Sequence, residues 1–203
     1  MGRAPDGKIV GHRRVGIFGG TFDPPHNGHV AVACEATDAL DLHELLWVPA
    51  GEPPHKSGME VTRASLRLRM TEVVAAVDPR FRVCDLETRR AGPSYMVDTL
   101  RELRTASADA DLFLLLGVDQ YLELDSWQDP DVIPTLARLA VLDRGGESLP
   151  AGISQDHVLS VPVARIDISS TQVRARVRDG RDVSDLVPAA VARIIEAEGL
   201  YRG

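Results

Sequence analysis

The residues best suited to chemistry lie in one short segment, GGTFDPPHNGH, which runs from Gly19 to His29. It follows an apolar run and precedes an alanine-rich stretch, so its backbone must turn sharply between a strand and a helix. Gly19 and Gly20 let a ligand approach the backbone closely. The start of the helix offers unpaired N–H groups, and His26 and His29 add side-chain donors beside them. Together these features predict a phosphate-binding site.

Two other interpretations of this segment stay open. His26 and His29 could ligate a metal, although no third histidine, cysteine or carboxylate stands at a suitable spacing. They could also be structural, with the Asp-Pro-Pro sequence at 23–25 forming a simple turn. The segment is neither GxGxxG nor a P-loop, because no GK[ST] follows it. Two histidines that bracket Gly28 between a strand and a helix favour the phosphate interpretation.

A second candidate anion site is the sequence ISSTQVR, from Ile168 to Arg174. Ser169, Ser170 and Thr171 stand where a helix should begin, so their hydroxyls and N–H groups can bind an anion. Arg174, one turn later, can bind two phosphate oxygens at once. The competing interpretation is an ordinary serine or threonine N-cap. Two anion sites at one edge of a predicted sheet are more specific than either site alone.

The motifs are positioned by strand-like and helix-like stretches that alternate along the chain. Apolar runs predict strands at residues 15–18, 44–49, 81–86 and 111–117, a fifth within 136–142 and a sixth within 158–168. Helical patterns span residues 29–40, 62–77, 95–104, 171–178 and 188–198. Thr62 is the expected N-cap of the second helix, and Gly199 is expected to end the last one.

Continuous apolar strands that alternate with helices predict a parallel sheet covered on both faces. We therefore expect an α/β fold, a Rossmann-like doubly wound and mainly parallel sheet, in a single domain with a small C-terminal helical part. Ligands in such folds bind at the carboxyl ends of the strands, where the strand order reverses. The domain is expected to span residues 15–203, after a disordered polar leader at residues 1–14.

Composition excludes several classes of protein. The 203 residues carry a formal net charge of −7, so the chain is not built to coat nucleic acid or an anionic membrane. No apolar run approaches the roughly 20 residues of a membrane span, and the N-terminus has no apolar signal region. Cys34 and Cys84 are expected to be reduced thiols of a cytoplasmic protein, although a disulfide between them stays possible. The oligomeric state is not predicted.

The sequence His26-Asn27-Gly28-His29 resembles the [HT]-x-G-H signature of the nucleotidylyltransferase superfamily. The surrounding segment is similar to the version found in nicotinate-nucleotide adenylyltransferases, and ISSTQVR is similar to that family's ISSTxxR motif. The resemblance spans residues 15–202. It implies catalytic roles for His26, His29 and Arg174. The ATP-binding residues that it implies are Gly19, Gly20, Thr21, Phe22, His26, Gly28, His29, Lys56, Ser169, Ser170, Thr171 and Arg174.

The same resemblance implies a mononucleotide site. The loop sequence Pro93-Ser94-Tyr95 is similar to the family's loop before its third helix, which binds the nicotinate carboxylate through backbone groups. Met96 replaces the threonine expected next, which bears on the choice between acid and amide substrates. A carboxylate at the end of a strand can accept ribose hydroxyls, and an indole can stack on a pyridine ring. The expected mononucleotide-binding residues are Asp119, Trp127, Ser94, Tyr95, Met96 and Arg144.

The resemblance implies adenylyl transfer from ATP to nicotinate mononucleotide, which gives deamido-NAD and pyrophosphate in NAD biosynthesis. The acceptor phosphate is already an anion, so the reaction needs positioning and charge neutralisation rather than a general base. Mg²⁺ is expected to accompany ATP, with no metal site made of protein groups alone. Nicotinamide mononucleotide or another phosphate acceptor is the alternative within this chemistry. A non-catalytic nucleotide sensor and a metal-dependent hydrolase are the alternatives outside it.

Overall fold

A computed structural model describes residues 12–53, 61–143 and 158–202. Six strands form one sheet in the order β3-β2-β1-β4-β5-β6, and every neighbouring pair is parallel. The strands are β1 (Arg14–Gly20), β2 (Glu44–Pro49), β3 (Phe81–Val83), β4 (Asp111–Gly117), β5 (Arg138–Asp143) and β6 (Val158–Pro162). The order reverses between β1 and β4, so this junction is where a doubly wound sheet binds ligands.

The central strands are apolar along their length because helices cover both faces of the sheet. In β4 every residue after Asp111 is buried. Its side chains alternate between two core clusters: Phe113 and Leu115 belong to one, and Leu112 and Leu114 belong to the other. This alternation is the period of two expected for a strand whose faces are both packed.

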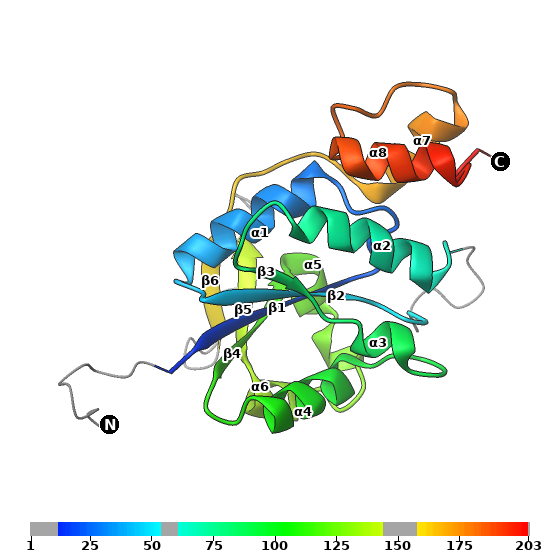
Figure 1. The fold of residues 1–203 in the computed structure, drawn as a ribbon. Coiled ribbons are helices and arrows are strands. Elements are labelled where there is room, and N and C mark those ends of the chain that lie inside the picture. The colour runs from blue at the N-terminus through cyan, green and yellow to red at the C-terminus, as the bar shows by residue number, and fades with distance from the viewer. Residues whose placement is uncertain (1–11, 54–60, 144–157, 203) are drawn as a thin grey trace.

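The helices divide between the two faces of the sheet (Figure 1). The helices are α1 (Asn27–Ala39), α2 (Ala64–Ala75), α3 (Leu86–Arg89), α4 (Met96–Ala106), α5 (Val118–Leu122), α6 (Ile133–Leu136), α7 (Ser170–Arg178) and α8 (Ala189–Ala197), with a 3-10 turn η2 (Leu124–Ser126). Helices α1, α2, α7 and α8 contribute to one core cluster, and α4 and α6 contribute to the other.

The predicted fold class is confirmed: the protein is a doubly wound α/β fold with a parallel sheet and C-terminal helices. Several details differ from the prediction, and three of them lie in β1, in β3 and at the start of α2. Arg14, assigned to the leader, is the first residue of β1. Strand β3 ends at Val83 rather than at residue 86, because the chain turns there into the short helix α3. Thr62 does not cap α2; Arg63 occupies the N-cap, and the Thr62 N–H donates to Asp23 Oδ2.

Both cysteines are free thiols. Burial raises the pKa of Cys34 and of Cys84, so neither is a reactive thiolate at neutral pH. Over the described ranges, none of the helices has both the length and the apolar character needed to cross a bilayer. Nor do the residues placed in the structure include a group of three or more His, Cys, Asp or Glu side chains that could hold a metal ion.

Candidate active site

Two histidines build the N-terminus of α1. His26 is the N-cap, and its Nδ1 accepts a hydrogen bond from the His29 N–H at 3.3 Å. The His29 Nδ1 accepts in return from the His26 N–H at 3.1 Å. This is the reciprocal arrangement of a capping box, made here with imidazoles in place of the usual hydroxyl and carboxylate. The start of the helix therefore fixes both rings relative to the backbone.

The capping bonds also determine how the rings are protonated. Because each Nδ1 accepts a hydrogen bond, each neutral ring carries its proton on Nε2. The rings are stacked, with centroids 3.6 Å apart and planes inclined by 28°. A Cβ at Gly28 would lie 3.1 Å from His26 Nδ1, so glycine leaves this end of the helix open to a ligand. The pair thus places two Nε2–H groups beside the positive end of the α1 dipole.

An aromatic contact holds His29 from the other side. Phe22 is buried and has a φ of 51°, an uncommon left-handed conformation for a non-glycine residue. Its ring packs against His29 at a centroid distance of 5.2 Å, and Phe18 lies edge-on at 6.2 Å. The turn after β1 therefore places Phe22 where it supports the imidazole.

The second motif begins α7 and reaches the first one. Ser169 is the N-cap of α7 and accepts from the Gln172 N–H at 3.1 Å, while the Ser170 hydroxyl donates to Pro24 O at 2.8 Å. Arg174 donates from Nη1 to Asp23 O at 2.7 Å and from Nη2 to Thr171 Oγ1 at 3.2 Å. The predicted proximity of the two motifs is confirmed. Arg174 binds the turn that leads to His26.

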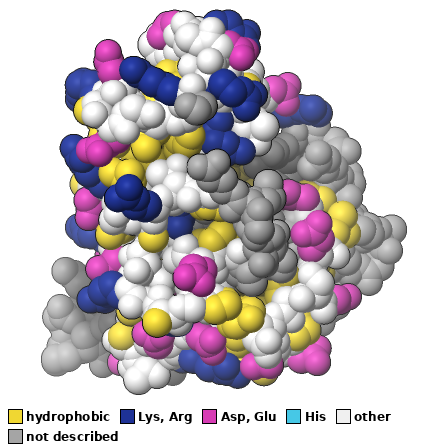
Figure 2. Space-filling model, turned by 90° about the vertical axis from the view of Figure 1, so that its right-hand side faces the viewer, with side chains coloured by type: hydrophobic (Ala, Val, Ile, Leu, Met, Phe, Trp, Pro, Cys, Tyr) yellow, Lys and Arg dark blue, Asp and Glu magenta, His cyan; other side chains and the backbone are white. Residues whose placement is uncertain are grey.

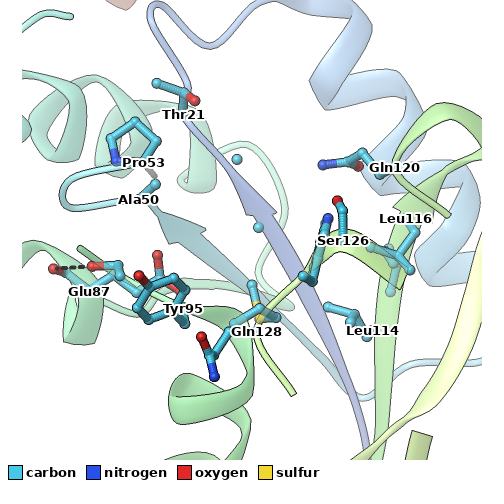
Figure 3. Close-up of a pocket in the computed structure, with 16 residues that line it drawn as sticks. Thr21, Ala50, Pro53, Glu87, Tyr95, Leu114, Leu116, Gln120, Ser126 and Gln128 are labelled. Atoms are coloured by element: carbon cyan, nitrogen blue, oxygen red, sulfur yellow. Dashed lines mark hydrogen bonds between the residues drawn. The ribbon is translucent and has the colours of Figure 1, made fainter. Parts of the chain in front are cut away.

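Two cavities open at the carboxyl ends of β1 and β4. The smaller, about 230 Å³, is the one that contains the histidines. The larger, about 330 Å³, contains two aromatic side chains, Tyr95 and Trp127. Figure 3 shows the larger cavity with Glu87 and Tyr95 on one side and Gln120 and Ser126 on the other. The cavities share Gly19, Gly20, Thr21 and Gln120, so they meet over the end of β1.

Most of the predicted ATP-binding residues gather around the smaller cavity. Its lining includes Gly19, Gly20, Thr21, Phe22, His26, Gly28, His29 and Ser170. Ser169 and Thr171 lie at the start of α7 and are exposed. Lys56 lies outside the described residues.

The predicted mononucleotide residues divide between the cavities. Ser94, Tyr95, Met96 and Trp127 line the larger one. Asp119 is exposed and lines the smaller one instead, because it stands one residue into α5 after the end of β4. Arg144 lies outside the described residues.

Met96, the departure from the family pattern, is the first residue of α4. A Cβ at Gly19 would lie 2.6 Å from its Cε, so the methionine thioether fills the space that this glycine leaves. Trp127 is half-buried and packs partly against the second core cluster.

Several residues in or beside the site were not predicted from the sequence, among them Gln120, Glu87 and Arg67. Gln120 lines both cavities, and its Oε1 accepts from the Gly117 N–H at 3.1 Å. Glu87 lines the larger cavity and is buried, with Thr99 donating to its Oε1 at 2.8 Å. Arg67 is buried beneath the loops after β1 and β2. Gln120 could have been found from its place next to Asp119 at the end of a buried strand.

Comparisons with known proteins agree with this geometry. The family model described as Cytidylyltransferase-like matches residues 17–176. A Thermomicrobium roseum protein named "Probable nicotinate-nucleotide adenylyltransferase" is 40% identical over 198 residues, covering 93% of this chain and 92% of that protein. A Thermus thermophilus protein with the same name is 43% identical over 189 residues, covering 93% and 100%.

The fold is also similar to that of solved structures. A Plasmodium falciparum nicotinic acid mononucleotide adenylyltransferase, complexed with NaAD, superimposes with a TM-score of 0.80 at 19% identity. The match covers 94% of this chain and 98% of the other. With relatives at 40% identity or more along almost its whole length, this chain belongs to the nicotinate-nucleotide adenylyltransferase family of cytidylyltransferase-like nucleotidyltransferases.

Proposed function

We propose that this protein transfers the adenylyl group of ATP to the phosphate of nicotinate mononucleotide, which forms deamido-NAD and releases pyrophosphate. The observation that carries the proposal is the pair of cavities that meet over the end of β1. One offers histidines and a helix N-terminus, which suit a polyphosphate. The other offers Tyr95 and Trp127, which suit a planar base.

The reaction is an in-line displacement at phosphorus. A phosphate oxygen of the mononucleotide attacks the α-phosphorus of ATP, a new P–O bond forms, and the bond to the bridging oxygen of pyrophosphate breaks. Pyrophosphate leaves with that electron pair. The attacking group is already an anion at neutral pH, so catalysis depends on alignment and on neutralising crowded negative charge.

The residues around the smaller cavity supply this neutralisation. His26 and His29 donate from Nε2, the N-terminus of α1 adds its positive dipole end, and α7 adds a second helix start with Ser170 and Arg174. Mg²⁺ enters with ATP as part of the substrate, bound mainly by phosphate oxygens and water, which are the ligands it prefers. The two free cysteines are in keeping with a cytoplasmic enzyme.

The choice of acceptor is the feature to test. Pyrophosphate release is measured from ATP and Mg²⁺ with nicotinate mononucleotide, nicotinamide mononucleotide or phosphopantetheine in parallel reactions. We expect the largest kcat/KM with nicotinate mononucleotide. A larger kcat/KM with nicotinamide mononucleotide would support adenylyl transfer but would show that the amide, not the acid, is the preferred acceptor. No release with any acceptor, by protein that still binds ATP, would indicate a nucleotide sensor.

A further inference from the structure

Arg67 is a cation buried in the interior next to the active site. Only 1% of its surface is exposed, and it lies on the face of α2 that also buries Met70, Thr71 and Val74. The guanidinium is fixed by four backbone carbonyls. Nε donates to Thr62 O at 2.8 Å, Nη1 to Thr21 O at 2.8 Å and Ala50 O at 2.6 Å, and Nη2 to Gly51 O at 2.7 Å.

These carbonyls belong to three separate segments of the chain. Thr21 follows β1, Ala50 and Gly51 follow β2, and Thr62 precedes α2. The first two segments are also joined directly, because the Ala50 N–H donates to Gly20 O at 2.9 Å. One planar group with donors in fixed directions therefore sets the relative positions of the loops at the carboxyl ends of two neighbouring strands.

The loops that Arg67 joins form one wall of the larger cavity. Thr21 and Ala50 both line that cavity, whereas only Thr21 lines the smaller one. Gly51, the next residue after Ala50, packs against the backbone of α3, because a Cβ on Gly51 would lie 2.2 Å from Glu87 O. Figure 3 shows Thr21 and Ala50 together at this side of the cavity. A shift of either loop would change the width of the cavity.

Burying the charged guanidinium of Arg67 costs more free energy than a purely structural role requires. Burial lowers the pKa of Arg67, and the nearby Asp23 carboxylate opposes that shift. A buried charge is expensive to desolvate, and an apolar side chain of similar volume often stabilises a fold as well or better. What an apolar side chain cannot do is hold carbonyls of three segments in one geometry.

We propose that Arg67 is a positioning residue for the mononucleotide substrate. It holds the carbonyl-bearing wall of the larger cavity so that the acceptor phosphate is aligned with the α-phosphorus of ATP. The inference rests on the proposed function, because it assigns the larger cavity to the mononucleotide. Arg67 touches neither substrate; it acts through the backbone at Thr21 and Ala50.

The test compares Arg67→Lys with Arg69→Lys. Lysine at 67 keeps the charge, but its three N–H groups diverge from one atom and cannot reach the carbonyls of all three segments. Arg69 lies on the same helix, is exposed and pairs with Glu198, so Arg69→Lys is the matched control. The readouts are kcat, KM for each substrate and thermal unfolding, with circular dichroism to verify the fold.

For Arg67→Lys we expect kcat/KM for nicotinate mononucleotide to fall by about 10- to 100-fold, the size of effect that a small misplacement of reacting groups produces. The KM for ATP should change much less, because the smaller cavity shares only Thr21 with this wall. Arg69→Lys should keep the kinetic constants of the unsubstituted protein.

Two results would overturn the inference. One is a folded Arg67→Lys variant with unchanged kcat and KM values and only a lower melting temperature. The other is an Arg67→Lys variant that does not fold, because that result would show that Arg67 is needed for folding rather than for positioning the substrate. A failure of the proposed function looks different: the unsubstituted protein then shows no transfer to nicotinate mononucleotide at all.

Discussion

His26 and His29 use the two nitrogens of each imidazole for different purposes. The Nδ1 atoms cap α1, and in the proposed reaction the Nε2 atoms donate to phosphate oxygens. The sequence motif could predict that the histidines face an anion. It could not predict that they cap the helix for each other, because histidine is not among the usual N-cap residues. The capping holds the donors in place before substrate arrives, which lowers the cost of reorganisation.

His29→Ala tests this arrangement. The substitution removes one donor to the phosphates, and we expect kcat to fall about 100- to 1,000-fold, as when one donor is lost from a preorganised anion site. Loss of the cap should cost only about 1 kcal/mol of stability, so the fold persists. His12→Ala is the control, because that ring bonds Asp109 O at the opposite end of β4. Turnover like that of the unsubstituted protein would remove His29 from the chemistry.

Long or fully buried helices and strands were predicted from the sequence more accurately than short ones. The bounds of β2 and β4 agree with the prediction, because strands buried on both faces are continuous apolar runs. Helices α3 and α5, four and five residues long, are too short to show a helical period. Gly19, Gly20 and Asp119, which line the cavities beside strand ends, were predicted, but Gln120 was not. Arg67 and Glu87 were not, because charged side chains are seldom buried.

A signal for Arg67 is nevertheless present in the sequence. Arg67, Met70, Thr71 and Val74 recur at helical spacing, so the arginine shares the apolar face of α2. A charged residue on that face is an exception that calls for partners nearby. Glu87 offers no comparable pattern, because α3 has only four residues.

Glu87, on α3, makes stability depend on pH. Burial raises its pKa above the ordinary value of 4.5, against the opposing effects of Thr99, Arg90 and Arg67. The folded state therefore favours the protonated carboxyl. Its contribution to stability is present below about pH 4.5 and is lost as pH rises through the raised pKa.

Glu87→Gln should remove this dependence, because the amide stays neutral and its oxygen can still accept from Thr99. We expect the melting temperature of Glu87→Gln minus that of the unsubstituted protein to increase as pH rises above 4.5. Thermal unfolding from acidic to neutral pH measures this, with the exposed Glu196→Gln as control. Parallel curves for Glu87→Gln and the unsubstituted protein would contradict the account.

At the scale of the whole molecule, the C-terminal part folds back onto the turn that begins α1. The Tyr201 hydroxyl donates to Asp23 Oδ1 at 2.7 Å, Arg174 donates to Asp23 O, and the Asn27 N–H donates to Leu186 O at 2.8 Å. Figure 1 shows α7 and α8 beyond α1 and α2, and Figure 2 shows Lys and Arg side chains with Asp and Glu side chains among them at this end of the molecule. The C-terminal part thus packs on the turn that carries His26, and α7 contributes Ser170 to the lining of the smaller cavity.

Tyr201→Phe tests the contact between the C-terminal part and the turn at Asp23. Burial and the Asp23 carboxylate raise the pKa of Tyr201, so its hydroxyl remains a donor at working pH. Loss of that donor leaves the buried Asp23 with one partner fewer, and we expect the free energy of unfolding to fall by about 1–3 kcal/mol. Urea denaturation measures the change. Tyr121→Phe is the control, because that ring packs against the other core cluster. Equal stability of both variants would show that the contact contributes nothing.

The most direct test of adenylyl transfer follows the label of ATP into the products. The protein is incubated with Mg²⁺, nicotinate mononucleotide and ATP labelled at the α-phosphorus or, in a parallel reaction, at the γ-phosphorus. We expect the α label to appear in a dinucleotide and the γ label to appear in pyrophosphate, in equal amounts. A γ label in the mononucleotide would show phosphoryl transfer instead and would contradict the central claim, as would the absence of any labelled dinucleotide.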